Sequence, residues 1–311
     1  MVILIFEPWN LGDLIIAADS AKKLTKLNFK ISFVCDPKWS EWLKSLSFVE
    51  NIIEFHIPWT EKVKKYDLRK YNIKEILNLR KEINKIKPNC IWEPRGDIRN
   101  YLFLSFLLQK KIISFWYKKN INVYKRIDYF IKYLGIKNYK TVVNNKKKKM
   151  KHIVCFFGAY WKNRRVPFDI ACILVEKSLK IGYNISIILQ PNDSKDRWQS
   201  VSKKYPSKIF LIKDDLLKIS SKIREADLCI STDSAFLHMA YFYNVRTIGL
   251  FASLNADEWA PPDCKVIYAK NPIPAKLRYK FEYGNIQPLK NLPISDVISA
   301  IKFYDKSFLK D

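Results

Sequence analysis

Residues 229–240 read Cys-Ile-Ser-Thr-Asp-Ser-Ala-Phe-Leu-His-Met-Ala, an apolar run that breaks into four small polar residues and then resumes at helical spacing. This pattern predicts a strand that ends where a helix begins. Serine, threonine and aspartate all cap helices, and a helix N-terminus offers unpaired backbone N–H groups and a partial positive charge to an anion. The turn from Ser231 to Ser234 is therefore a natural place to hold a phosphate.

Two residues of this stretch also have a simpler interpretation. Asp233 is a residue type that caps helices, and His238, one turn further on, fits a buried core position. Taken alone, the stretch favours these structural roles over ligand binding. The choice depends on the rest of the chain.

Composition indicates a globular protein with anionic partners. The 311 residues suit two domains of ordinary size, and 48% hydrophobic residues provide ample material for their cores. The formal net charge of +26 predicts partners such as phosphorylated sugars, nucleic acid or a membrane surface, although an overall richness in lysine, isoleucine and asparagine accounts for part of it.

Neither secretion nor membrane insertion is indicated. No run of about 18 apolar residues occurs, and the first seven residues, Met-Val-Ile-Leu-Ile-Phe-Glu, contain neither a basic leader nor a cleavage site. The six cysteines are far apart, and several lie in apolar runs, as is typical of reduced core residues. We therefore expect a cytoplasmic protein.

Short β-rich runs alternate with segments of helical period, which is the pattern of parallel sheets covered by helices. Strands are expected at residues 2–6, 30–35, 51–55, 89–92, 111–115, 152–157, 184–189, 208–212, 227–230 and 246–250. A proline-rich segment follows at residues 261–274, and a helix ends the chain. The sequence predicts an α/β fold of two Rossmann-like domains that face each other across a cleft.

A polar stretch with four consecutive lysines, residues 146–149, separates the two halves. It has no interleaved aromatic residues to stack bases, so a solvated connector is favoured over a nucleic-acid patch. We expect an N-terminal domain at residues 1–140, a linker at 141–151, a C-terminal domain at 152–290 and a terminal helix at 291–311.

Polar residues gather where strands end, which is where open parallel sheets bind ligands. Asp13 follows the first strand and has two open roles, as a general base that takes a proton from a hydroxyl group or as a cap of the first helix. After the strand at 89–92, Arg95 and Arg99 can clamp an anionic or polyhydroxylated substrate. Alternatively, Asp97 and Arg99 only begin the next helix.

The strand at 152–157 is followed by three cations in four residues, namely Lys162, Arg164 and Arg165. Such a turn can neutralise a diphosphate leaving group, although an exposed basic loop explains it equally well. The chain has no G-x-G-x-x-G and no G-x-x-x-x-G-K-[ST], which argues against a dinucleotide oxidoreductase and a P-loop NTPase.

Five landmarks, taken in order, resemble glycosyltransferase family nine, the ADP-heptose:lipopolysaccharide heptosyltransferases and their relatives. They are Asn10-Leu11-Gly12-Asp13, Arg95-Gly96-Asp97-Ile98-Arg99, residues 158–167, residues 231–238 and residues 250–261. The resemblance spans nearly the whole chain, and its last two landmarks are the most specific. It implies a GT-B fold, an inverting sugar transfer from a nucleotide-diphosphate sugar, no required metal and no cofactor beyond that co-substrate.

The resemblance also implies roles for individual residues. Asp13 matches the family's general base. The residues implied to bind the donor are Arg164, Lys162, Asp233, Ser234, Ala235 and His238. This assignment agrees with the chemistry, because a helix N-terminus and a guanidinium can stabilise a leaving diphosphate without a bound cation.

The chain departs from the family pattern at the donor site. Arg164 stands where the family usually has lysine, Ser234-Ala235 replaces Thr-Gly, and Ala-Ser-Leu at residues 252–254 replaces Gly-Pro-Thr. A backbone that relied on glycine at residue 235 is limited here to ordinary φ values. The identity of the donor sugar is therefore open.

The expected reaction is the transfer of heptose from ADP-heptose to a lipopolysaccharide or lipooligosaccharide core, with Arg95 and Arg99 as the acceptor-binding candidates. An anionic, membrane-held acceptor suits a basic N-terminal domain at the inner-membrane surface, and no nucleic-acid partner is expected. One alternative is a family relative that uses another nucleotide sugar for a capsule or protein acceptor. The other is a non-catalytic basic protein that binds nucleic acid or membrane on a transferase scaffold.

Overall fold

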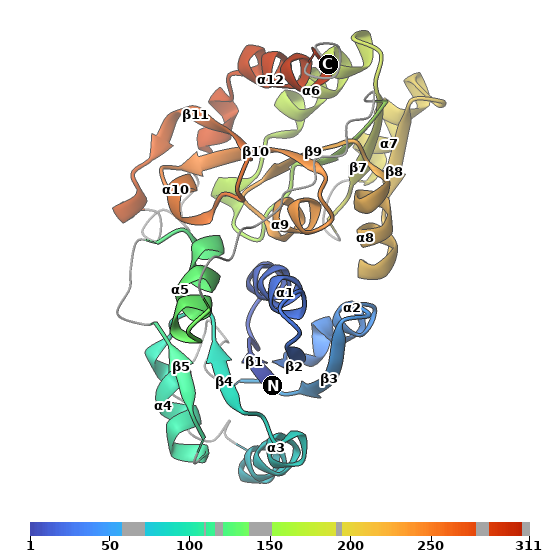
Figure 1. The fold of residues 1–311 in the computed structure, drawn as a ribbon. Helices are drawn as coiled ribbons and strands as arrows, with labels where there is room; N and C mark the ends of the chain where they lie inside the picture. The colour runs from blue at the N-terminus through green and yellow to red at the C-terminus, as the bar shows by residue number, and fades with distance from the viewer. Residues whose placement is uncertain are drawn as a thin grey trace. The chain divides into compact units, whose positions relative to one another are not determined.

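The computed structural model describes residues 1–57, 72–108, 110–115, 121–136, 151–190, 195–277 and 286–306. The chain divides into two compact units, Met1–Thr141 and Val142–Asp311. Each unit contains one parallel sheet with helices on its faces (Figure 1). Apart from residue 151, the predicted linker lies outside the described residues, so the expected domain bounds stay a prediction.

The first unit carries five strands in the order β3-β2-β1-β4-β5. The strands are β1 (Val2–Phe6), β2 (Lys30–Cys35), β3 (Val49–Glu54), β4 (Cys90–Glu93) and β5 (Ile112–Ser114). The helices are α1 (Leu11–Thr25), α2 (Ser40–Lys44), α3 (Ile73–Ile86), α4 (Ile98–Leu107) and α5 (Arg126–Tyr133), with short 3-10 turns η1 (Pro37–Trp39) and η4 (Val123–Lys125).

Alternation along the strands gives this sheet two apolar faces. Leu4 of β1 joins a core with Leu79 of α3 and Leu104 of α4. On the opposite face, Trp92 of β4 stacks on Phe130 of α5 with ring centroids 4.6 Å apart. Figure 1 accordingly shows α3 and α4 on one side of the sheet and α1 and α5 on the other.

The second unit carries six strands in the order β11-β10-β9-β6-β7-β8. They are β6 (His152–Phe156), β7 (Asn184–Ile188), β8 (Ile209–Ile212), β9 (Leu228–Thr232), β10 (Arg246–Ser253) and β11 (Lys265–Ile273). The helices are α6 (Phe168–Lys180), α7 (Lys195–Lys204), α8 (Leu216–Glu225), α9 (Ala235–Phe242), α10 (Ala256–Trp259) and α12 (Ile294–Lys306), with 3-10 turns η5 (Lys162–Arg164), η6 (Ala275–Leu277) and η7 (Pro288–Asn291).

Both sheets follow the Rossmann plan, as the alternation predicted. Each begins in its middle, runs to one edge and then returns to the other side, so that β1 and β4 are neighbours in the first unit and β6 and β9 in the second. At such a switch point the connections after the two strands diverge and leave room for a ligand.

One strand was not predicted. Residues 261–274 were interpreted only as a proline-rich segment, but β11 occupies most of them. β11 lies at the sheet edge and pairs with β10 alone. Pro272 is tolerated there because an edge strand needs ladder hydrogen bonds on only one side.

The cysteines behave as the sequence predicted. All six are unpaired, and four of them, Cys35, Cys90, Cys155 and Cys229, are buried. Among the helices in the described ranges, none combines the length and the hydrophobicity needed to cross a membrane.

Replacing the fully buried Leu4 by alanine removes apolar contacts at the centre of the first sheet. We expect Leu4→Ala to lower the free energy of unfolding by about 2–5 kcal/mol, measured by chemical denaturation. The matched control is Leu102→Ala, because Leu102 is 58% exposed on α4; its effect should stay within about 0.5 kcal/mol. Equal losses in the two variants would contradict the assigned core.

Candidate functional site

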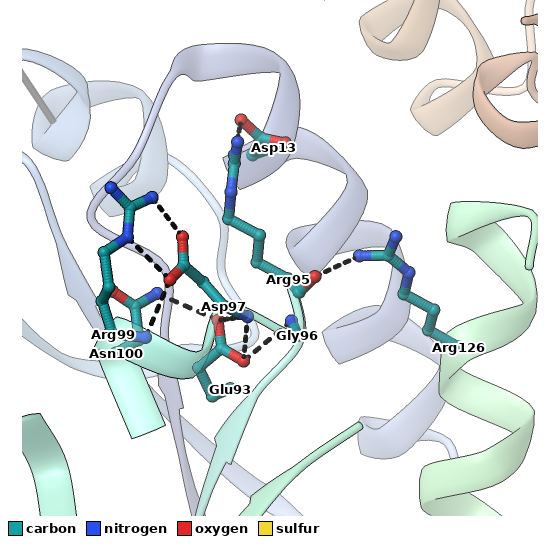
Figure 2. Close-up of polar contacts among 8 residues, drawn as sticks. All are labelled: Asp13, Glu93, Arg95, Gly96, Asp97, Arg99, Asn100 and Arg126. Carbon is teal, nitrogen blue, oxygen red and sulfur yellow. Dashed lines mark hydrogen bonds and ion pairs between the residues drawn. The ribbon is translucent and has the colours of Figure 1, made fainter. Parts of the chain in front are cut away.

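Charged residues converge at the switch point of the first sheet (Figure 2). Glu7 follows β1, Asp13 lies in the first turn of α1, and Arg95 follows β4. These segments meet because β1 and β4 pair in parallel and end at the same edge of the sheet. Arg126, the first residue of α5, points from that helix toward the Arg95 carbonyl (Figure 2).

Asp13 and Arg95 form a partly buried ion pair. An Arg95 guanidinium nitrogen lies 2.6 Å from Asp13 Oδ2, and the two side chains are 27% and 15% exposed. The Arg95 guanidinium also lies over the Trp9 ring, 4.1 Å from its centroid, and Arg126 donates a 2.5 Å hydrogen bond to the Arg95 carbonyl. Asp13 is therefore paired with a residue that is fixed at its guanidinium by Trp9 and at its backbone by Arg126.

The structure decides one of the two roles considered for Asp13, namely that of a helix cap. The interpretation of Asp13 as the cap of the first helix is wrong, because the N-cap position belongs to Asn10. Asp13 instead directs its carboxylate at Arg95, 82 residues away in the chain. The other role, as a general base, stays a prediction.

Glu93, at the end of β4, organises the loop that carries Arg95. It is fully buried and accepts hydrogen bonds from the backbone N–H groups of Gly96 and Asp97 and from the side chains of Asn100 and Ser114. Burial raises the pKa of the Glu93 carboxyl, and the hydrogen bonds from these donors reduce the rise without reversing it. Since each of these partners donates, the carboxylate is the form of Glu93 that matches its surroundings.

Arg99 pairs with its own neighbour. Asp97 is the N-cap of α4, accepts a hydrogen bond from the Arg99 N–H and holds the Arg99 guanidinium at 3.0 and 2.5 Å. Burial opposes the ionisation of Asp97, but the hydrogen bonds from Arg99 outweigh it and lower the Asp97 pKa. The interpretation that these two residues begin a helix is confirmed, and the acceptor-binding role of Arg95 and Arg99 stays a prediction.

A second group of side chains converges at the switch point of the second sheet. Arg164, in η5 after β6, places a guanidinium nitrogen 3.5 Å from Asp233 Oδ2, directly after β9. Asn255, after β10, donates to the same oxygen at 3.3 Å and accepts from Ser253 at 2.7 Å. Asp233 is thus held by two side chains at the carboxyl ends of three adjacent strands.

The helix start predicted from residues 231–240 is confirmed, with a change in the role of Asp233. Ser234 occupies the N-cap position of α9 with φ −154°, so the interpretation of Asp233 as that cap is wrong. The Ser234 hydroxyl lies 2.9 Å from the Ser231 hydroxyl. Neither Ser234 nor Ala235 adopts a left-handed φ, so the loss of the family's glycine causes no strain here.

Two other residues predicted to bind the donor lie on the elements next to Asp233 and Arg164, namely α9 and η5. His238 lies on α9 and is only 4% exposed, whereas Lys162, at the start of η5, is exposed. The Thr232 hydroxyl donates a 2.5 Å hydrogen bond to the Gly158 carbonyl and so ties the end of β9 to the loop after β6. A Cβ atom at residue 158 would lie 2.5 Å from the Gln190 side chain, so a larger residue there would require Gln190 to move.

Sequence reasoning missed four residues of these sites, namely Glu7, Glu93, Arg126 and Asn255. Glu7 and Glu93 had a usable signal, because each is an acidic residue at the end of a β-rich run. Arg126 and Asn255 had none, because their partners lie 31 and 22 residues away.

Residues 128–282 match the model of glycosyltransferase family 9 (heptosyltransferase). A comparison with curated proteins gives no match. Similar solved structures include a family 9 glycosyl transferase from Veillonella parvula (TM-score 0.72, 15% identity, covering 100% of this chain and 97% of that one). They also include the E. coli heptosyltransferase WaaC with ADP (TM-score 0.74, 13% identity, covering 98% of this chain and 100% of that one).

A third similar structure is the iron-containing dodecameric glycosyltransferase TibC from enterotoxigenic E. coli (TM-score 0.54, 11% identity, 99% of this chain and 80% of that one). At sequence identities of 11–15%, structural similarity is evidence for a shared fold and not for a shared substrate. The two parallel sheets and the match over nearly the whole chain confirm the GT-B fold that the sequence predicted.

The donors around Glu93 allow a test of the loop that positions Arg95. In Glu93→Gln an amide nitrogen must face N–H or O–H donors, and we expect a loss of about 1–3 kcal/mol in the free energy of unfolding. The control is Glu41→Gln, whose carboxylate is 74% exposed, with an expected change below about 0.5 kcal/mol. Denaturant titration near neutral pH measures both, and an unchanged Glu93→Gln would contradict the role of Glu93.

Proposed function

Because the chain belongs to glycosyltransferase family 9, we propose that it catalyses an inverting, metal-independent transfer of heptose from ADP-heptose to a lipopolysaccharide or lipooligosaccharide core. The observation that carries the proposal is the convergence of Arg164 and Asp233 at the start of α9. A nucleotide-diphosphate sugar needs positive charge and N–H donors at one place, and this turn supplies both.

In the proposed donor complex, the diphosphate takes the place of Asp233 as a partner of Arg164. The present contact of 3.5 Å is at the limit of hydrogen-bond length, so little energy is lost when Arg164 turns to a phosphate. The exposed Lys162 adds a second cation, and the backbone at Ser234 and Ala235 faces the phosphates. Asp233, held by Asn255, is left to accept hydrogen bonds from the sugar.

In the proposed acceptor complex, Asp13 takes the proton of the attacking hydroxyl group. In the resting protein its carboxylate is paired with Arg95. An anionic acceptor that draws Arg95 toward its own phosphate groups leaves the Asp13 carboxylate open to the attacking hydroxyl group. Arg95 then links acceptor binding to activation of the base, and Arg99 offers a further cation on the same loop.

The membrane-held acceptor also needs a surface on the first unit, and α4 provides an apolar one. Ile98, Leu102 and Phe106 recur every four residues on one face of α4 and are 46%, 58% and 95% exposed. The exposed Lys110 and Lys111 follow the helix directly. An apolar stripe beside lysines suits an anionic lipid surface, with about 1 kcal/mol for each well-placed cation. We therefore place the protein in the cytoplasm, at the inner membrane.

The donor site is tested by thermal shift with ADP-, UDP- and GDP-sugars. A sugar nucleotide at about 100 times its dissociation constant should add about 2.7 kcal/mol of stability, and ADP-heptose should act at the lowest concentration. Arg164→Gln should weaken binding by about 1.5–3 kcal/mol, because a charged hydrogen bond is lost. Arg224→Gln, at an exposed position on α8, is the control for the charge change. A preference for another nucleotide would favour the family relative with a different sugar, and no response to any would contradict the proposal.

The catalytic role is tested with Asp13→Asn. We expect turnover to fall by about 10²–10⁴-fold while donor affinity is kept, because the amide accepts no proton. Turnover is measured with ADP-heptose and purified lipooligosaccharide core, and affinity by the thermal shift above. Full turnover of Asp13→Asn would disprove the role as base.

Membrane docking is tested by sedimentation with vesicles. Phe106→Asp should abolish binding to vesicles that contain anionic lipid, because a carboxylate replaces the most exposed apolar side chain of α4. Phe303→Asp is the matched control, since Phe303 is 63% exposed on α12 in the other unit. Equal binding by the two variants would place the membrane surface elsewhere.

A further inference from the structure

Glu7 is a buried carboxyl group that the proposed reaction does not use. Its side chain is 2% exposed, and its Oε1 atom is buried without a hydrogen-bond partner among the described residues. Glu7 lines the same cavity of about 20 Å³ as Asp13, Arg95 and Arg126. An unpaired carboxylate would be costly in such a place.

The charged groups that face Glu7 come from every element around the cavity. Asp13 lies on α1, Glu93 at the end of β4, Arg95 in the loop after β4, and Arg126 on α5. Three carboxyl groups therefore face two guanidinium groups. If all were ionised, one buried negative charge would have no compensation.

The contacts show which of the three carboxyl groups lacks a compensating partner. Asp13 has Arg95 at 2.6 Å, and Glu93 receives hydrogen bonds from four residues that all donate. Arg126 donates to the carbonyl of Arg95. Glu7 Oε1 has no such donor, so the neutral acid is the form that its surroundings accept.

Electrostatics point in the same direction. Burial raises the pKa of Glu7 well above its ordinary value, and the negative charges of Asp13 and Glu93 raise it further. Arg95 and Arg126 lower it, but they do not reverse the shift. Glu7 and Asp13 line one small cavity, so a negative charge on Asp13 favours the proton on Glu7.

We propose that Glu7 and Asp13 hold a single proton between them in the resting protein, that this proton resides on Glu7, and that Glu7 thereby acts as a positioning residue for Asp13. The neutral Glu7 leaves Asp13 as the ionised carboxyl of the cavity and as the partner of Arg95. The consequence for catalysis rests on the proposed role of Asp13 as base, whereas the sharing of one proton requires no reaction.

The protonation of Glu7 gives the cavity a defined pH behaviour. While Glu7 is neutral, Asp13 is the ionised carboxyl of the cavity and lies opposite Arg95. As pH rises through the raised pKa of Glu7, a second negative charge appears beside Asp13 and Arg95. The state with one ionised carboxyl opposite Arg95 is therefore lost when Glu7 ionises.

Infrared spectroscopy of the full chain tests the location of the proton. At neutral pH the difference spectrum between the parent and Glu7→Gln should contain one carboxylic-acid C=O band that the variant lacks. In Asp13→Asn the same band should persist but disappear at lower pH than in the parent, because the charge that holds the proton on Glu7 is removed. The absence of the band in the parent would overturn the proposal, as would an unshifted titration in Asp13→Asn.

Stability gives a second readout, with a sign that follows from linkage. The pKa of Glu7 is higher in the folded than in the unfolded chain, so its contribution to stability is fully present below about pH 4.3 and is lost as pH rises toward the folded value. At neutral pH, unfolding of the parent should release about one proton more than unfolding of Glu7→Gln. The melting temperature of Glu7→Gln relative to the parent should therefore rise with pH.

Glu93→Gln is the matched control, because it makes the same chemical change in the same network at a carboxyl surrounded by donors. At neutral pH it should lower the melting temperature, whereas Glu7→Gln should not lower it. Equal losses in both variants would show that Glu7 is ionised. Full turnover of Asp13→Asn with the infrared result intact would remove the base and leave the shared proton, so the two proposals fail separately.

Discussion

The site in each unit depends on one constraint of parallel β structure, namely that every connection must cross a face of the sheet before the next strand begins. Both sheets start in the middle, and the later strands return to the other side of the first. The chain therefore leaves β1 and β4, and likewise β6 and β9, in diverging directions from one edge. Polar residues that follow those strands meet there without being neighbours in sequence.

The first unit uses this edge to bury charge. A buried ion pair gains little by itself, because desolvation costs about as much as the attraction returns. The pair of Asp13 and Arg95 persists because its surroundings are built around it, with Trp9 beneath the guanidinium and Glu93 holding the loop. Such a network orients a carboxylate more than it stabilises the fold, which is the arrangement expected of a proton acceptor.

The second unit has a looser ion pair at the same kind of edge. The Arg164 and Asp233 side chains are 21% and 11% exposed, and their contact is long. Under the proposed function, such a long contact would compete less with a phosphate than a short pair would. The helix start at Ser234 lies beside it and adds a partial positive charge. The two units thus place ion pairs of different tightness in similar geometry, at 2.6 Å in the first and 3.5 Å in the second.

The sequence by itself determined the alternation of strands and helices, the two sheets and the position of Asp13, Arg164 and Asp233 at strand ends, because these follow from local periodicity. It did not reveal β11, because residues 261–274 were interpreted only as a proline-rich segment. An edge strand such as β11 tolerates Pro272. Only the tertiary structure decided that Asp13 pairs with Arg95 across 82 residues, and that Glu7 lacks a compensating donor. Pairing and burial depend on which strands become neighbours, and that is a property of the folded sheet rather than of any short stretch of chain.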